Sequence, residues 1–403
     1  MKNSSASKIR LSRLSLGALA LTALLSACGG GGGGDKPSTP ARAVNQLYTQ
    51  SNEVSNVVVH FQRMSDGTIV RKESTATGGT GTNAVGPNGM TGPDSLASQH
   101  AVIVDPDGKT LFAVNAGDNS ISVFTIDAVT GGLTLKKRSA VSAGQAPNSL
   151  ALNNGVLYAT FLKGSAQLAA LKVGADGALT QIGAYDLVAL TGISTSAPTQ
   201  VIAAPDAKHV VVSAGTRSNA VVSFSINADG TLANPVANTE NIATPFAAQF
   251  LPGASTPTYL STGIAAVSLT SYNYNVSTGK LAQVSQDVAA GVAAPCWLSI
   301  TPDGKVAFVG NGSGAISSFS IDAQAQVKLL NAQAAVEPSA LAGVPSVAGD
   351  SWISPDGKFL YTAYLGADKI VAYAIGQNGS LAKLNEVAVG TATKLSLQGL
   401  VGL

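Results

Sequence analysis

A polar turn that ends at or near glycine, followed by a short apolar strand, recurs seven times along this chain. From Gly67 to Gly379 the turns are spaced by about 52 residues, which is the length of a four-stranded β-propeller blade. The turns are Ser65–Gly67, Thr130–Gly132, Ala175–Gly177, Ala228–Gly230, Ser277–Gly279, a degenerate Ala323–Ala325, and Gln377–Gly379. The pattern predicts an all-β protein, a seven-bladed β-propeller of four-stranded antiparallel blades.

Within one unit the four strands can be assigned from the alternation of apolar and polar residues. The clearest unit places the innermost strand at 101–104, and the next three at 110–115, 120–126 and 133–138. In Ile121–Ile126 the apolar side chains recur at every second position, the period of a strand with one packed face. The tight turn Asp105–Gly108 joins the first two strands, because Pro presets φ and Gly accepts a positive φ. No helical period of comparable strength follows residue 40.

The two ends of the repeat complement each other. Leu47–Gln50 matches a second strand without an innermost strand before it, whereas Gln398–Leu403 matches an innermost strand with no second strand after it. The N- and C-terminal strands should therefore pair in one blade and close the ring, which removes an open sheet edge.

Residues 1–27 have the pattern of a secretion signal. Lys2, Lys8, Arg10 and Arg13 precede the apolar run Leu14–Leu25, which is too short to span a bilayer. Leu25–Cys28 resembles the bacterial lipobox, which implies cleavage before Cys28 and lipidation of its thiol; the alternative is an ordinary signal peptide with a chance cysteine. Residues 28–43 then form a Gly-rich flexible tether.

We expect a protein anchored to a membrane of the cell envelope. The Gly after Cys28 favours the outer membrane, on its periplasmic or surface face.

Charge and cysteine content indicate which partners and cross-links to expect. Without the four basic residues of the leader, 20 Lys and Arg face 22 Asp and Glu, and no basic cluster suits nucleic acid. Cys296 is the one cysteine left besides Cys28, so no internal disulfide is expected. Residues 44–403 exceed the usual domain size, but a propeller adds blades around one axis. We expect a single, monomeric domain.

Two segments carry a family resemblance. Thr301–Asn311 followed by Ile316–Asp322, and the parallel segment Asp105–Asp127, resemble the repeats of the seven-bladed lactonase family. That family includes the propeller type of 6-phosphogluconolactonase and the fungal muconate-lactonizing enzymes, and the resemblance covers about residues 45–403. It implies a propeller and, as one option, a hydrolase that opens a sugar lactone. Its motifs are specific for the blade and much less so for the reaction.

The ligand face of such a ring is expected where innermost strands begin and second strands end. The side chains expected at this face are of several polar types, and few of them are cationic. The candidate residues are His100, Asn115, Asn148, Arg217, Trp297, Asn311 and Asp350. The lactonases resembled here tend to carry Arg-His at an inner strand and Asn-Arg after a second strand. This chain has Gln99-His100, Asn115-Ala116 and Asn311-Gly312 instead, so the family's Arg is missing each time.

His100 is the candidate catalytic residue, because an imidazole titrates near neutral pH and can act as a general base; the alternative is a hydrogen-bonded structural His. Asp350 and Trp352 offer a carboxylate and a ring for stacking, although Trp in a blade commonly packs in the core. Asp105–Gly108 lacks the Glu of a calcium loop, and no zinc-protease or serine-hydrolase motif occurs. No metal or cofactor is expected.

Two functions remain open. The first is a lipid-anchored platform that binds an envelope protein, a glycan or another ligand, and the weak charge and missing Arg favour it. The second is a lactonase that acts on an unphosphorylated or weakly charged lactone.

Overall fold

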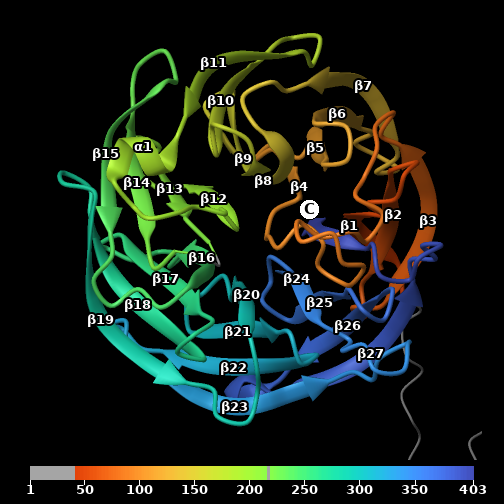
Figure 1. The fold of residues 1–403 in the computed structure, drawn as a ribbon. Coiled ribbons are helices and arrows are strands. Elements are labelled where there is room, and N and C mark those ends of the chain that lie inside the picture. The colour runs from red at the N-terminus through yellow and green to blue at the C-terminus, as the bar shows by residue number, and fades with distance from the viewer. Residues whose placement is uncertain (1–40, 216–217) are drawn as a thin grey trace, which may run out of the picture. The chain divides into compact units, whose positions relative to one another are not determined.

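The computed structural model describes residues 41–215 and 218–403. The predicted signal peptide, Cys28 and most of the tether lie outside the described residues, as does Arg217. Seven four-stranded antiparallel sheets surround a central channel, as predicted (Figure 1). The strands, blade by blade, are β28 Gln398–Gly402, β1 Ala43–Gln50, β2 Val57–Met64, β3 Ile69–Ala76; β4 Val102–Val104, β5 Thr110–Asn115, β6 Ser120–Ile126, β7 Leu133–Ala140; β8 Gln145–Asn153, β9 Val156–Lys163, β10 Leu168–Val173, β11 Leu179–Tyr185; β12 Gln200–Ala203, β13 His209–Ser213, β14 Val221–Ile226, β15 Leu232–Asn238; β16 Pro245–Phe250, β17 Thr258–Gly263, β18 Ser268–Asn275, β19 Lys280–Val288; β20 Pro295–Ile300, β21 Val306–Asn311, β22 Ala315–Ile321, β23 Val327–Val336; β24 Ala348–Ile353, β25 Phe359–Tyr364, β26 Lys369–Ile375, β27 Leu381–Ala388.

The ring closes through the predicted pairing of the chain ends. Strand β28 lies antiparallel to β1, with Leu47 opposite Gly402 and Gln50 opposite Gln398. In Figure 1 the blue end of the chain lies beside the orange first blade. The Arg63 guanidinium donates from Nη1 to the Leu403 carbonyl at 3.1 Å and lies 4.8 Å from the Trp352 ring centroid. Arg63 thus links the two chain ends within the closing blade and also packs this blade against the last complete one.

Each of the seven repeated turns joins the third and fourth strands of its blade and packs against the preceding blade. The Tyr48 hydroxyl donates to the Gly131 carbonyl at 2.7 Å, and the Tyr158 hydroxyl to the Gly230 carbonyl at 2.9 Å. At Gly230, φ is +87° and an added Cβ would lie 2.5 Å from Cγ2 of Val156. Glycine is required there by both backbone and packing, which explains the most regular feature of the sequence.

Two short helical elements were not predicted. Helix α1 covers Leu187–Thr191, with Asp186 accepting from Ala189 N at the N-cap, and a 3₁₀ turn covers Gln377–Gly379. Both are too short to produce a helical period in the sequence. Within the described part of the chain, no helix is long and apolar enough to cross a membrane.

A Gly-rich insertion joins β3 to β4, and the C-terminal part of this insertion crosses the channel axis. Ser98 Oγ donates to the Asn148 carbonyl on β8 at 2.8 Å, and Gln99 N to the Thr199 carbonyl beside β12 at 3.1 Å. Trp297 Nε1, on β20, donates to the Ser98 carbonyl at 3.0 Å. Since these strands belong to different blades around the ring, the segment 94–100 lies across one end of the channel.

Candidate active site

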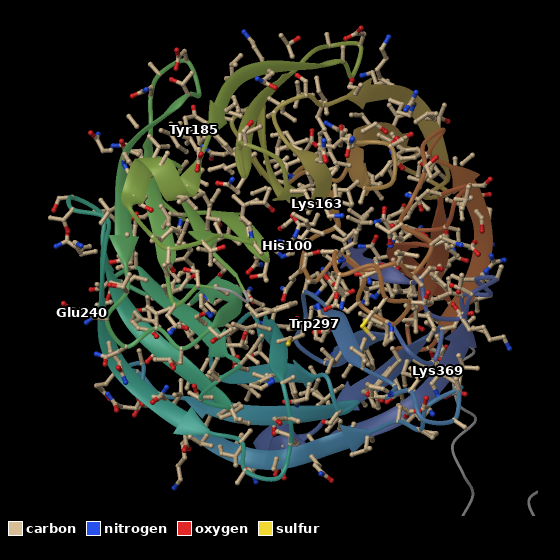
Figure 2. The ribbon with its side chains drawn as sticks, in the orientation of Figure 1. His100, Lys163, Tyr185, Glu240, Trp297 and Lys369 are labelled. Atoms are coloured by element: carbon tan, nitrogen blue, oxygen red, sulfur yellow. The ribbon has the colours of Figure 1, made fainter. Side chains whose placement is uncertain are left out.

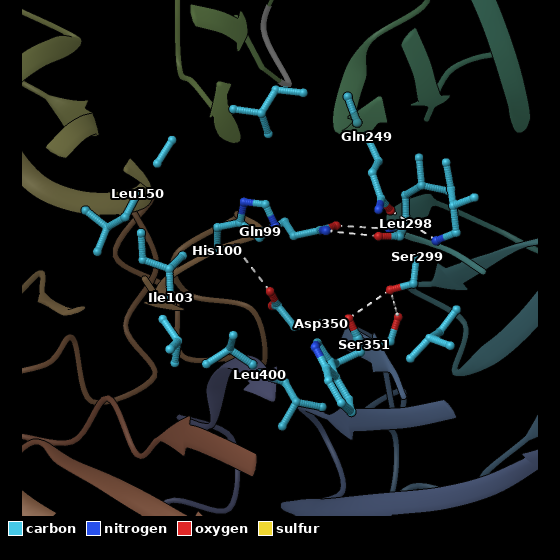
Figure 3. Close-up of a pocket in the computed structure, with 18 of the residues that line it drawn as sticks. Gln99, His100, Ile103, Leu150, Gln249, Leu298, Ser299, Asp350, Ser351 and Leu400 are labelled. Atoms are coloured by element: carbon cyan, nitrogen blue, oxygen red, sulfur yellow. Dashed lines mark hydrogen bonds between the residues drawn. The ribbon is translucent and has the colours of Figure 1, made fainter. Parts of the chain in front are cut away.

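A cavity of about 710 Å³ occupies the channel on the far side of the segment 94–100. It is lined by residues of all seven innermost strands and extends to Pro106, Pro252 and Pro302 in the turns that follow three of them. Gln99, His100 and Asp350 form its floor (Figure 3). The cavity therefore reaches the face of the first turns, whereas we expected ligands at the opposite face. That face is crossed by the insertion, whose path the strand repeat does not specify.

Backbone contacts hold the floor in place. Gln99 donates from Nε2 to the Leu298 carbonyl and accepts at Oε1 from Leu298 N, both at 3.0 Å (Figure 3). His100 N donates to Oδ1 of Asp350 at 3.1 Å, and the φ of His100 is +71°. A left-handed backbone is unfavourable for a residue with a Cβ. The paired contacts on either side fix it, so the floor has one defined geometry.

Asp350 is a buried carboxyl group with one uncommitted oxygen. Its side chain is 1% exposed, and Oδ2 has no partner among the described residues. Burial raises the pKa of Asp350 to about 7, against the opposing effect of the His100 and Gly399 backbone N–H groups. Near neutral pH the group is thus divided between its acid and base forms. The neighbouring Asp94 is affected in the same direction. Burial raises its pKa well above the usual range, and the charge of nearby Asp350 raises it further.

The His100 imidazole is neutral and oriented. Burial lowers the pKa of His100 to about 4. Gln200 accepts from Ala248 N at Oε1, at 2.5 Å, so the opposite end of its amide, Nε2, faces His100 Nδ1 at 3.3 Å. An amide nitrogen can only donate, which assigns Nδ1 as the acceptor and the ring proton to Nε2. In this tautomer His100 offers a hydrogen-bond donor, whereas a general base needs a free acceptor.

The walls of the cavity differ from one side to the other. The polar wall consists of Gln249, Ser299 and Ser351, from the adjacent strands β16, β20 and β24. Ser299 Oγ lies 2.8 Å from both the carbonyl and the hydroxyl oxygen of Ser351 (Figure 3). The apolar wall consists of Ile103, Leu150, Leu152 and Ile202, from β4, β8 and β12. A ligand in the channel meets polar groups on one side and hydrocarbon on the other.

Two of the candidate residues lie in the cavity, and four of the others lie outside it. His100 and Asp350 share the floor, and Trp352 also lines the cavity. The amides of Asn115, Asn148 and Asn311 are fully buried and make hydrogen bonds within or between blades, for instance Asn148 Nδ2 to the Pro198 carbonyl at 2.7 Å; of the three, Asn311 has an Oδ1 without a partner among the described residues. Trp297 is buried against Phe246, with ring centroids 5.2 Å apart. These four side chains stabilise the ring. Figure 2 labels Trp297 and, nearer the middle of the ring, His100.

Several site residues were missed in the sequence. Gln249 interrupts the apolar run of its innermost strand, and that interruption was its only local signal. Gln200 follows Thr199 at the start of its strand, where the sequence placed it at the expected ligand face without a role. Asp94 belongs to the Gly-rich insertion, to which the sequence assigned no role. Gln99 was seen as a departure from the family pattern, and its structural role is the anchoring of the floor.

Positive charge is absent from the described lining of the cavity, which contains no Lys or Arg. Lys369 lies outside this lining and contacts Glu337 at 2.7 Å and Glu386 at 2.6 Å. Among the residues described, no group of three or more His, Cys, Asp or Glu side chains could hold a metal ion. The floor and walls are therefore suited to an uncharged ligand.

The fold defines this protein as a seven-bladed β-propeller with a cavity on the propeller axis. Residues 43–244 and 257–346 match the family described as "Lactonase, 7-bladed beta-propeller", and the chain belongs to that family. No curated protein sequence matches it.

Similar solved structures share the fold at low sequence identity. A putative 6-phosphogluconolactonase from Bacteroides fragilis is 16% identical, with a TM-score of 0.65 over 92% of this chain and 100% of that one. One from Bacteroides uniformis is 17% identical, with a TM-score of 0.68 over 90% and 99%. The periplasmic gluconolactonase of Pseudomonas aeruginosa is 17% identical, with a TM-score of 0.66 over 89% and 98%. At such identities the similarity shows the fold alone.

Proposed function

We propose that this protein is a hydrolase that opens an uncharged, unphosphorylated lactone in the axial cavity. The observation that carries the proposal is the Asp350 carboxyl at the cavity floor, with Oδ2 unpartnered and a pKa raised to about 7. A base whose pKa lies near the working pH combines a useful fraction of the ionised form with a strong tendency to accept a proton. Family membership and the fold of the gluconolactonase neighbour agree with this choice.

In the proposed reaction Asp350 acts as the general base. Ionised Asp350 takes a proton from water as the water oxygen bonds to the lactone carbonyl carbon. The carbonyl oxygen becomes an oxyanion, to which the Nε2–H of His100 at the floor can donate a hydrogen bond. When the tetrahedral intermediate collapses, the ring C–O bond breaks and protonated Asp350 returns its proton to the departing alkoxide. The products are a hydroxy acid and the regenerated enzyme.

The test is hydrolysis of δ-valerolactone by the wild-type domain and by Asp350→Asn, which keeps the shape of the side chain. We expect the variant to lose about 10²- to 10⁴-fold in kcat. In the wild type, kcat/KM should rise with pH through about 7, because only ionised Asp350 accepts the proton, whereas His100, with a pKa of about 4, stays neutral. Asp303→Asn, in an exposed turn, is the matched control and should retain full activity. An Asp350→Asn variant as active as the wild type would contradict the proposal.

A second candidate is ligand binding without turnover. Asp350 is 1% exposed, and the floor is rigidly held by Gln99, two features that equally suit a binding site. In that case the wild-type domain should retain a neutral ligand while hydrolysing no lactone above the spontaneous rate. The same assay with δ-valerolactone therefore separates the two functions.

We also propose that the propeller is held at an envelope membrane through lipid on Cys28, as its lipobox-like sequence suggests. Cys28→Ser should leave an unprocessed precursor or release the protein from the membrane fraction, because no other thiol lies near the cleavage site to carry the lipid. The measurements are precursor size and membrane partition of the full chain. Unchanged processing and membrane recovery would exclude lipid anchoring, without bearing on the reaction.

A further inference from the structure

The two unlike walls of the axial cavity indicate what kind of lactone it accepts. Ile103, Gln249 and Ser299 each stand three residues before the proline of the turn that follows, Pro106, Pro252 and Pro302, so they line the channel at one level. At this level β16 and β20 present polar groups, while β4 and β12 present the isoleucines Ile103 and Ile202 (Figure 3). The cavity is therefore amphipathic across its width: neighbouring blades on one side present polar side chains at this level, and blades on the other side present apolar ones.

The polar wall can hold the ring and carbonyl of a lactone. Gln249 accepts from Ile300 N at Oε1, at 3.0 Å, which leaves the Nε2 amide as a donor for a ligand. The Ser299 and Ser351 hydroxyls bond each other at 2.8 Å and can turn toward a ligand oxygen at little cost. These groups adjoin Asp350 at the floor, on the same strand as Ser351.

The apolar wall has more hydrocarbon than a small polyhydroxylated ring can use. Ile103 and Leu152 are half-buried, and the side chains around them form the packed edge of neighbouring blades. Near the mouth the strands of the polar wall also turn apolar, at Phe250, Ile300 and Ile353, so hydrocarbon lines both sides toward Pro252 and Pro302. A sugar lactone would leave its hydroxyl groups facing hydrocarbon without partners, which is unfavourable. An alkyl chain would instead remove this surface from water.

We propose that the substrate is a lactone whose ring carries an alkyl chain, with the ring on the floor and polar wall and the chain along the apolar wall. This inference rests on the proposed lactonase function and names its substrate class. A cavity of about 710 Å³ is within the size range of sites for such molecules. The absence of Lys and Arg from the described lining agrees with a substrate that carries no phosphate.

The experiment measures kcat/KM for δ-valerolactone and for δ-lactones bearing three-, five- and seven-carbon chains. We expect about a fourfold rise for each methylene that becomes buried, with gluconolactone a poor substrate. Ile103→Gln should flatten this dependence, and the fold should tolerate it because Gln249 stands at the equivalent strand position. Val288→Ser, at an exposed site 46% accessible to solvent, should leave the dependence unchanged.

Binding of the corresponding δ-lactams, which resist hydrolysis, is measured by calorimetry in parallel. Hydrolysis of every lactone with no dependence on chain length would overturn the inference and leave the lactonase function standing. Lactam affinity that rises with chain length, without hydrolysis of any lactone, would overturn the lactonase function and support the ligand class. If Ile103→Gln unfolds, Ile103→Val, which removes one methylene, should still weaken the longest lactam by up to about fourfold; an unchanged affinity would count against the apolar wall.

Discussion

The backbone N–H of His100 donates to the Asp350 carboxylate at 3.1 Å, joining two residues that are 250 positions apart in the sequence. His100 ends the insertion that crosses the channel, and Asp350 lies on β24, the innermost strand of the last complete blade. This bond connects the floor of the cavity to the ring and directs Oδ1 of Asp350 to the backbone. It leaves Oδ2 as the uncommitted oxygen on which the proposed chemistry depends.

The raised pKa of Asp350 should appear in the pH dependence of folding. An Asp whose pKa is about 7 in the folded state, against an ordinary value of 3.8, favours the folded state in its protonated form. Its contribution is complete below about pH 4 and is lost as the pH rises through 7. Asp350→Asn should therefore gain stability relative to the wild type between pH 4 and 8, by at most about 4 kcal/mol. Urea denaturation at several pH values measures the difference; one that does not change with pH would refute the assigned pKa.

Gln99 should be essential to the geometry of the floor. Gln99→Leu removes both partners of the buried Leu298 backbone, and each unpaired group costs about 1–3 kcal/mol. We expect faster hydrogen exchange at Leu298 N and a lower melting temperature. Gln249→Leu is a useful comparison, since it removes one backbone bond where Gln99→Leu removes two. Equal stability of the two variants would show that the floor is held by other contacts.

The glycine of the repeated turn should be irreplaceable for packing as well as for φ. Gly230→Ala places a Cβ at a φ of +87° and 2.5 Å from Val156. Gly253→Ala is the matched control, because its φ is +69° and nothing lies within 4 Å of the added atom. The control should lose about 1–2 kcal/mol from the backbone alone, and Gly230→Ala clearly more. Chemical denaturation of both variants tests this, and equal losses would mean that packing at the turn is unimportant.

Closure of the ring should make the last strand necessary for the stability of the whole domain. Deleting Gln398–Leu403 exposes the edge of β1 and removes Leu400, a side chain 4% exposed whose burial contributes roughly 1.5–3 kcal/mol. Thermal unfolding of the truncated domain should begin well below that of full-length Leu400→Ala, which keeps the strand pairing. If the two melt together, the contribution of β28 is its side chain alone.

The sequence by itself determined the blade count, the strand order within a blade, the closing of the ring and the family. These features arise from local rules: alternation sets a strand, Pro-Asp-Gly sets a turn, and the Gly turn repeats because every blade packs on the one before it. The unpaired strands at the two ends then leave one way to close the ring. His100 and Asp350 could also be selected, since strand counting places both at innermost strand starts.

Only the tertiary structure decided where the cavity opens and what Asp350 and His100 can do in it. The insertion carries no period, and its path across the axis depends on contacts with Asn148, Thr199 and Leu298 in three separate blades. The pKa of Asp350 follows from burial by groups distant in sequence, and the His100 tautomer follows from the amide of Gln200. Residue type alone fixes neither, because protonation responds to the solvation and neighbours that folding supplies.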